Sequence, residues 1–145
     1  MIYVLYGQPA SGKTTLGKLL AEHLKIPFVI DGDEFRDMFA NRDYAKNGRI
    51  ENIKNANAVA TYLNKKDKNV VMCLVNPYEY LRKELNNNNQ DEVVGVFLQS
   101  SRDLRKQYYV EDFEIGDPEY TLTTDAPVEE SWCNLKNLLE LWKLV

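Results

Sequence analysis

Residues 7–15, GQPASGKTT, bring two glycines, a lysine and two threonines together at a fixed spacing. They complete the pattern G-x-x-x-x-G-K-[ST], with a short apolar run before it and a helical repeat after it. Glycines let such a backbone curl so that its N–H groups point at phosphate oxygens, and the next helix adds its positive end. We therefore expect this loop to bind ATP with Mg²⁺, through Gly7, Ala10, Ser11, Gly12, Lys13, Thr14 and Thr15.

Two acids after the second predicted strand are candidates for metal binding or proton transfer. Asp31 and Asp33 flank a glycine in the segment IDGDEFR. In an open α/β sheet this strand end lies beside the phosphate loop, where a carboxylate can position Mg²⁺ or accept a proton from an attacking hydroxyl. We expect Asp33 to be that carboxylate, because it would also cap the next helix and face the cleft. A plain helix cap is the structural alternative. Lys13 would neutralise phosphate charge, and Thr14 would join Asp33 on the metal.

A third group comes from the segment RIENI. Arg49 and Asn52 are three positions apart, so a helix would place them on one face. An arginine and an asparagine together suit a phosphate or sulfate group and a ribose edge. The alternative is a solvated helix start with an ion pair.

Short apolar runs alternate with helical repeats and must position these groups. Strands are predicted at 2–6, 27–30, 69–75, 92–98 and 119–125, and helices at 14–25, 33–39, after Arg49, at 78–85, at 101–107 and from Pro127 onward. This alternation predicts the α/β class, as one domain over 1–145 with a three-layer P-loop NTPase fold. Its parallel five-stranded sheet would carry helices on both faces. The run NNNN at 86–89 is expected in a solvated loop.

Composition limits the partners and the cellular compartment that we expect for this domain. Lys plus Arg number 18 and Asp plus Glu number 22, which gives a net charge of -4 and makes nucleic acid an unlikely partner. Cys73 and Cys133 are expected to be buried thiols in a reducing compartment. The first strand leaves no room for a signal peptide, and no apolar run is long enough to span a membrane. We expect a soluble cytoplasmic protein, with a homodimer left open.

In chain order, GQPASGKTT, DGDEFR, RIENI and VNPY resemble the adenylylsulfate kinase family. Those P-loop kinases use Mg·ATP to phosphorylate the ribose 3′-hydroxyl of adenylylsulfate. The resemblance implies a catalytic aspartate at Asp33, and it implies that two aromatic side chains stack on the substrate adenine. The acceptor-binding residues that it implies are Asp31, Arg36, Tyr44, Arg49, Asn52, Asn76, Pro77 and Phe113, with Tyr44 and Phe113 as the aromatic pair.

The sequence departs from that family at three places. Asn76 replaces a serine, Glu79 replaces an arginine, and the basic lid is replaced by SSRDLRKQYYVEDFEIG, part of a short lid region at about 100–118. Glu79 would disfavour a dianionic acceptor if it faced the pocket. Arg102 and Arg105, with Lys106, could still cover the ATP phosphates, and Arg102 is the predicted catalytic residue of the lid. A solvated helix is the alternative for these cations.

The predicted function is transfer of the γ-phosphoryl group of ATP to a hydroxyl of a small nucleotide-like acceptor, with the 3′-hydroxyl of adenylylsulfate as the leading candidate. One alternative is another nucleotide-linked or modified-nucleoside hydroxyl, including a hydroxymethylated base in DNA. Another is a nucleotide-binding module without turnover. The segment NKKD at 64–67 fits a guanine-reading pattern, but it precedes a strand instead of following one, so we interpret it as accidental.

Overall fold

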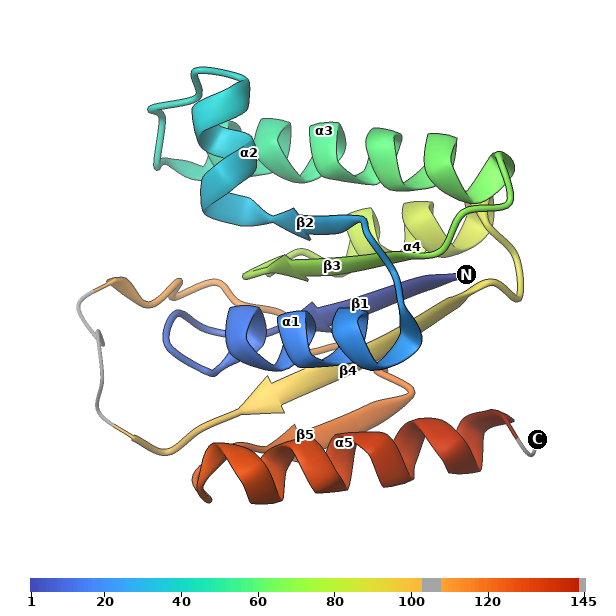
Figure 1. Cartoon of the computed structure of the whole chain (residues 1–145). Coiled ribbons are helices and arrows are strands. Elements are labelled where there is room, and N and C mark those ends of the chain that lie inside the picture. Colours follow the sequence, from blue (N-terminus) through green and yellow to red (C-terminus); the bar gives the residue numbers. More distant parts are fainter. Residues whose placement is uncertain (103–107, 144–145) are drawn as a thin grey trace.

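The computed structural model describes residues 1–102 and 108–143, without the side chains of residues 142 and 143. Residues 103–107 of the predicted helix at 101–107, and the side chains of Arg105, Lys106 and Trp142, therefore lie outside the described residues. Figure 1 shows the order of the elements, whose bounds are β1 Ile2–Tyr6, α1 Lys13–Leu24, β2 Val29–Asp31, α2 Gly32–Met38, α3 Lys46–Lys65, β3 Val70–Leu74, α4 Glu79–Asn88, β4 Val93–Gln99, β5 Tyr120–Thr123 and α5 Val128–Lys143.

The sheet is parallel throughout, in the order β2-β3-β1-β4-β5. The first strand therefore lies at the centre, where Ile2 pairs with Val70 on one side and with Val93 on the other. The chain moves first to one side of β1 and later to the other, so the sheet has a topological switch point at its carboxyl edge. Ligands of open α/β sheets bind at such a point, and the phosphate loop begins there.

Three layers follow from the alternation of side chains along each strand. Figure 1 shows α2, α3 and α4 on one face of the sheet and α1 and α5 on the other. In β1, Ile2, Val4 and Tyr6 join the core under α2, α3 and α4, whereas Tyr3 and Leu5 join the core under α1 and α5. The prediction of a five-stranded parallel sheet with helices on both faces is confirmed.

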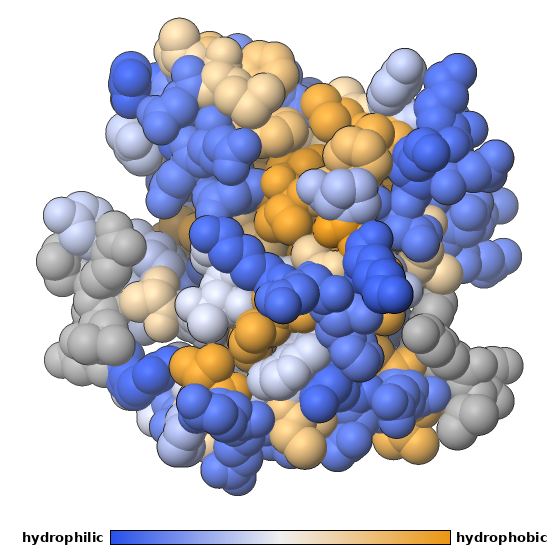
Figure 2. Space-filling model, viewed as in Figure 1, coloured by the Kyte–Doolittle hydropathy of each residue, from blue (hydrophilic) through white to orange (hydrophobic). Residues whose placement is uncertain are grey.

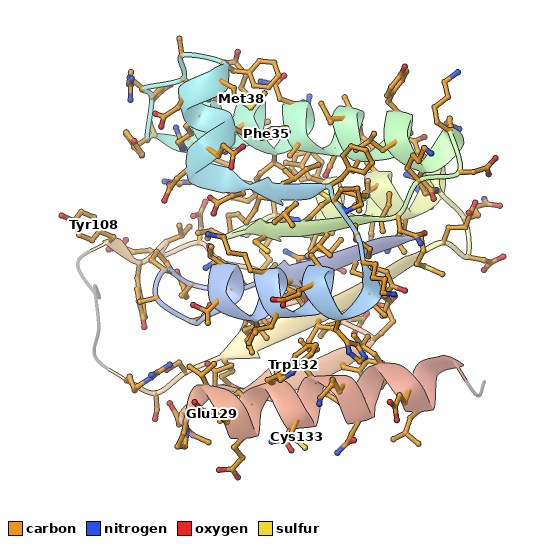
Figure 3. All side chains as sticks on the ribbon, viewed as in Figure 1. Phe35, Met38, Tyr108, Glu129, Trp132 and Cys133 are labelled. Carbon is orange, nitrogen blue, oxygen red and sulfur yellow. The ribbon has the colours of Figure 1, made fainter. Side chains whose placement is uncertain are left out.

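Helix α1 packs closely on the sheet, which fixes the loop in front of it. A Cβ atom on Gly17 would lie 2.1 Å from Sγ of Cys73 on β3, so only glycine fits at this position without a shift. Burial raises the pKa of the Cys73 thiol to about 12, so this side chain is a neutral packing group at physiological pH. The second cysteine was predicted wrongly, since Cys133 is exposed on the outer side of α5 (Figure 3).

The asparagine run is also not the solvated loop that was predicted. Residues 86–88 complete α4, and Asn89 is buried against α3, where its amide donates to Oγ1 of Thr61. Asn64 donates to Oδ1 of Asn89 and accepts from the amino group of Met1. Asn89 is therefore linked through Asn64 to the start of β1, whereas residues 86–88 are exposed.

Among the described residues, no helix is long and apolar enough to cross a membrane.

Candidate active site

The phosphate loop connects β1 to α1 and has the backbone that its glycines predict. Ala10 and Gly12 adopt positive φ angles of 64° and 95°, so the loop curls back before the helix begins. A Cβ on Gly7 would lie 2.5 Å from the carbonyl oxygen of Leu98. Only glycine therefore allows the loop to approach β4 this closely. Such a curl directs successive N–H groups toward a bound phosphate, so the loop fits a triphosphate.

The lysine of the loop lies across the cradle. The ammonium of Lys13 donates to the carbonyl of Gln8 at 2.9 Å and to Oγ of Ser11 at 3.4 Å. The next residue, Thr14, donates its hydroxyl to Oδ2 of Asp31 at 3.2 Å. A hydroxyl and a carboxylate facing each other beside a phosphate cradle form a fitting donor set for Mg²⁺, directly or through water.

Of the two acids in the segment IDGDEFR, Asp31 takes the cap position that was predicted for Asp33. Asp31 is the helix cap: its Oδ1 accepts from the N–H of Asp33 at 2.9 Å while its Oδ2 faces Thr14. Asp33 is exposed in the first turn of α2. The expectation that Asp33 caps this helix is wrong, because β2 already ends at Asp31 and α2 starts at Gly32.

Arg36 is buried, and its Nη1 stabilises the loop after α2. This atom donates to the carbonyl of Asp43 at 2.9 Å and to Oδ1 of Asn41 at 3.2 Å. The guanidinium also lies 4.2 Å from the ring centroid of Tyr44, whose residue is 63% exposed. The structure therefore brings Arg36 and Tyr44 together as a stacked pair, with the aromatic ring at the surface.

Apolar side chains gather near this pair at the free end of α2 (Figure 2). Met38 and Phe39 expose 65% and 46% of their surface there. Figure 3 shows Met38 at the end of α2.

Arg49 lies in the first turns of α3, which begins at Lys46, earlier than predicted. Its Nε and Nη2 both donate to the hydroxyl of Tyr78, at 3.1 and 2.9 Å, and its Nη1 donates to the carbonyl of Tyr44. The carboxylate of Asp112 lies 3.6 Å from Nη2 of Arg49 and 3.9 Å from Nζ of Lys46. Two cations, a phenol and a carboxylate thus meet where α3, α4 and the lid region approach one another.

Two buried asparagines at this edge carry polar atoms without partners among the described residues. Asn52 donates to the carbonyl of Gly32 at 3.3 Å, but its Oδ1 has no partner there. Asn76 follows β3 with a φ of 50° and is 1% exposed. Neither its Oδ1 nor its Nδ2 has a hydrogen-bond partner among the described residues. Buried polar groups are paired in most proteins, so these two amides need an explanation.

Residues 108–118 of the lid region are tied to the phosphate loop and the sheet at several points. Gln8 of the phosphate loop donates to the carbonyl of Val110 and accepts from its N–H, both at 2.9 Å. Tyr6 and Arg82 both donate to the carbonyl of Ile115, at 2.7 and 3.1 Å. Burial raises the pKa of Tyr6 to about 12, so its hydroxyl stays a donor, and burial lowers the pKa of Arg82.

Phe113 points into the core, although a stacking position on adenine was predicted for it. Its ring is stacked with Tyr6 at 6.3 Å and packs against Phe97 at 5.7 Å. A pocket of about 310 Å³ opens beside it and is lined by the phosphate loop, the end of β4 and residues 109–115. Figure 3 shows Tyr108 at the edge of the molecule, directed outward where this segment begins.

Arg102 stands at the other end of the lid region, beside the end of β5. Its Nε donates to Oγ of Ser100, and Ser100 and Ser101 both donate to the carboxylate of Asp125. These serine hydrogen bonds lower the pKa of Asp125. Thr124 donates to the carbonyl of Ser11 at 2.8 Å, so the strand end next to Arg102 is fixed to the phosphate loop.

Sequence reasoning missed four of these residues. Gln8 and Lys46 could have been found, because one lies inside the phosphate loop and the other lies one turn before Arg49. Asp112 and Asp125 gave no local signal, since their partners are far away in the sequence. Pro77 was predicted to touch the acceptor, and in the structure its carbonyl accepts from the N–H of Glu114 at 2.8 Å.

The fold and the phosphate loop together define the class, which is the P-loop kinase fold. The APS kinase of Mycobacterium tuberculosis, solved with AMPPNP and APS, matches with a TM-score of 0.80 over 96% of this chain and 96% of that chain, at 21% identity. Shikimate kinase from Aquifex aeolicus matches with a TM-score of 0.68 over 99% of both chains, also at 21% identity. Likeness at this identity shows the fold alone.

The chain belongs to the adenylylsulphate kinase family, whose model matches residues 1–112. Among curated proteins, it is 34% identical to the cytidine diphosphoramidate kinase of Campylobacter jejuni over 91 residues, 57% of this chain and 54% of that protein. It is 45% identical to the cytidylate kinase of Methanococcoides burtonii over 42 residues, 29% of this chain and 24% of that protein. The matches thus span about half or less of these relatives. The resemblance read from the motifs is confirmed.

Proposed function

We propose that this protein transfers the γ-phosphoryl group of ATP to a hydroxyl of a small nucleotide-linked acceptor. The observation that carries the proposal is the pairing of Thr14 with Asp31 beside the phosphate cradle, one helix away from Arg49 and Asn52. A hydroxyl and a carboxylate that could hold Mg²⁺, close to polar groups that could hold a second ligand, favour a phosphotransferase over a protein that binds nucleotide alone.

The transfer would form a bond from the acceptor oxygen to the γ-phosphorus and break the bond from that phosphorus to the bridging oxygen. ADP leaves with the bridging electron pair, and the hydroxyl proton passes to a carboxylate. Asp33 is our candidate for that carboxylate, since it is exposed at the helix start beside the cradle. Bound Mg²⁺ would neutralise phosphate charge, held by Thr14 and Asp31 instead of the predicted Thr14 and Asp33.

Lys13 and the lid would supply the remaining electrostatic stabilisation. Lys13 is expected to leave the carbonyl of Gln8 and meet the β- and γ-oxygens, since an ammonium binds phosphate more strongly than a carbonyl. Arg102, held by Ser100, would approach the phosphates from the lid side. Arg105 has the same proposed function, but it lies outside the described residues.

For the acceptor we propose a nucleoside carrying a 5′-linked anionic group. Arg49 and Lys46 would bind the anion, and Tyr44 would stack on the base with its exposed face. Adenylylsulfate is the acceptor that the family match suggests, because the segments DGDEFR and RIENI of the acceptor side are present. A cytidine-linked acceptor is the second candidate, because the relative with 34% identity is a cytidine diphosphoramidate kinase.

The test is ADP release with Mg·ATP and a panel of acceptors. The panel holds adenylylsulfate, cytidine diphosphoramidate, common nucleotides, and single-stranded and hydroxymethylated DNA. We expect acceptor-dependent ADP release with at least one nucleotide-linked acceptor and none with DNA. ATP binding without acceptor-dependent turnover across the panel would contradict the kinase proposal and favour a nucleotide-binding module.

A further inference from the structure

Asp112 is an unexpected neighbour for a site that should bind an anion. Its two carboxylate oxygens face different cations, Nη2 of Arg49 at 3.6 Å and Nζ of Lys46 at 3.9 Å. Both distances exceed those of a tight charge-assisted hydrogen bond, which lie at about 2.7–2.9 Å. The carboxylate therefore lies near both cations without a tight hydrogen bond to either, and all three side chains keep exposed surface, 61% for Lys46, 25% for Arg49 and 47% for Asp112.

Arg49 is held firmly in this position, so the cluster is more than a mobile surface ion pair. The hydroxyl of Tyr78 accepts from two of its nitrogens, and the side chain is only 25% exposed. Asp112 is 47% exposed, and its neighbour Phe113 is packed on Tyr6 and Phe97. The packed ring of Phe113 anchors the chain beside Asp112.

Two further acidic side chains come from the lid region and the start of α4. The side chain of Glu114 accepts from the N–H of Glu79 at the start of α4, and Glu79 forms an ion pair with Lys83. Glu79 therefore pairs with Lys83, and among the described residues no ion pair joins it to Arg49 or Lys46. Among the described residues, Asp112 is the acid that forms ion pairs with both Lys46 and Arg49.

The chemistry of a carboxylate separates two kinds of acceptor. An ionised carboxylate only accepts hydrogen bonds, and the outer oxygens of a sulfate also only accept. These two groups repel each other when they meet between the same cations. An amide nitrogen on phosphorus carries N–H donors, so it can donate to the carboxylate while the phosphoryl oxygens accept from the cations.

We infer that Asp112 determines acceptor specificity, selecting a nucleotide whose distal group carries an N–H donor, such as a phosphoramidate, over one that ends in sulfate. This inference rests on the proposed kinase function and names the substrate class of its acceptor site. Arg49 and Lys46 attract the anionic oxygens of either acceptor. The carboxylate of Asp112 distinguishes the remaining atom, nitrogen or oxygen.

The test compares acceptors that differ only in the distal group. Adenosine diphosphoramidate, adenylylsulfate and ADP share the base, ribose and first phosphate, and the cytidine phosphoramidate adds the effect of the base. Catalytic efficiency, kcat/KM, is measured by release of ADP from labelled ATP. We expect the wild-type protein to prefer the phosphoramidate over the sulfate by about tenfold or more, the size of a hydrogen bond to a charged group.

The variant Asp112→Asn should reduce this preference about tenfold, since the carboxamide donates as well as accepts and carries no charge. Efficiency with adenylylsulfate should rise while efficiency with the phosphoramidate falls. Asp117→Asn is the matched control, with the same change in an exposed acid of the same segment. It should leave the preference unchanged. Thermal unfolding of both variants checks that each is folded.

The outcomes separate the two proposals. Turnover by the wild-type protein with a preference that Asp112→Asn does not alter would overturn the specificity inference and leave the kinase proposal standing. A wild-type preference for the sulfate would do the same. No turnover with any acceptor would overturn both.

Discussion

The proposed donor half and the proposed acceptor half of this site are built by different means. On the donor side, backbone groups form the cradle, and Gly7, Gly12 and Gly17 are fixed by close approach or by positive φ. On the acceptor side, the groups are side chains from α2, α3, α4 and the lid region, several of them exposed. Backbone geometry constrains sequence tightly, whereas a side-chain site changes with each substitution. The donor half can therefore stay constant in a family while the acceptor half changes substrate.

The largest expected effect tests the donor half. Lys13→Ala should lower kcat about 100- to 1000-fold, as expected when one preorganised electrostatic group is removed from a transition state. ADP release at saturating acceptor measures it. The stabilisation of the protein by ATP, followed by thermal unfolding, should shrink as well. Lys18→Ala, an exposed lysine of the same helix, is the matched control and should behave as the wild type.

The second prediction tests whether the acceptor half binds its ligand independently of the ATP-binding half. Arg49→Ala should raise KM for the nucleotide acceptor about 10- to 100-fold, since hydrogen bonds to charged groups contribute about 1.5–3 kcal/mol. The KM for ATP should change little. Arg42→Ala removes an exposed arginine that pairs with Asp37, and it should leave both constants unchanged. An equal loss of ATP binding in Arg49→Ala would show that the two halves are one unit.

The same contrast explains how much could be predicted from the sequence. The apolar runs predicted the strands, and the glycine-lysine pattern predicted the phosphate cradle, because both depend on residues close together in the chain. The placement of Asp31 was missed, since one residue decides whether a strand end or a helix start carries the cap. Asn89 and Asp112 were missed because tertiary contacts define their environments. Phe113 was assigned from a family pattern that the match, ending at residue 112, does not cover.

The smallest expected effect concerns Asn76, whose buried amide has no partner among the described residues. A buried polar group without a partner costs about 1–3 kcal/mol, and glycine adopts a positive φ without strain. Asn76→Gly should therefore stabilise the ligand-free protein by about 1 kcal/mol, or about 3 °C in Tm, after the entropy of glycine in the unfolded chain is subtracted.

The same substitution should lower kcat/KM for the acceptor several-fold, because we propose that the amide of Asn76 forms hydrogen bonds when an acceptor binds. Asp91→Gly is the matched control: it is exposed, and its φ of 64° also favours glycine. That control should change stability through the backbone alone and leave acceptor kinetics unchanged. A gain in stability with no loss of acceptor efficiency in Asn76→Gly would show that this asparagine serves the turn and not the substrate. The acceptor half would then be smaller than its sequence motif suggests.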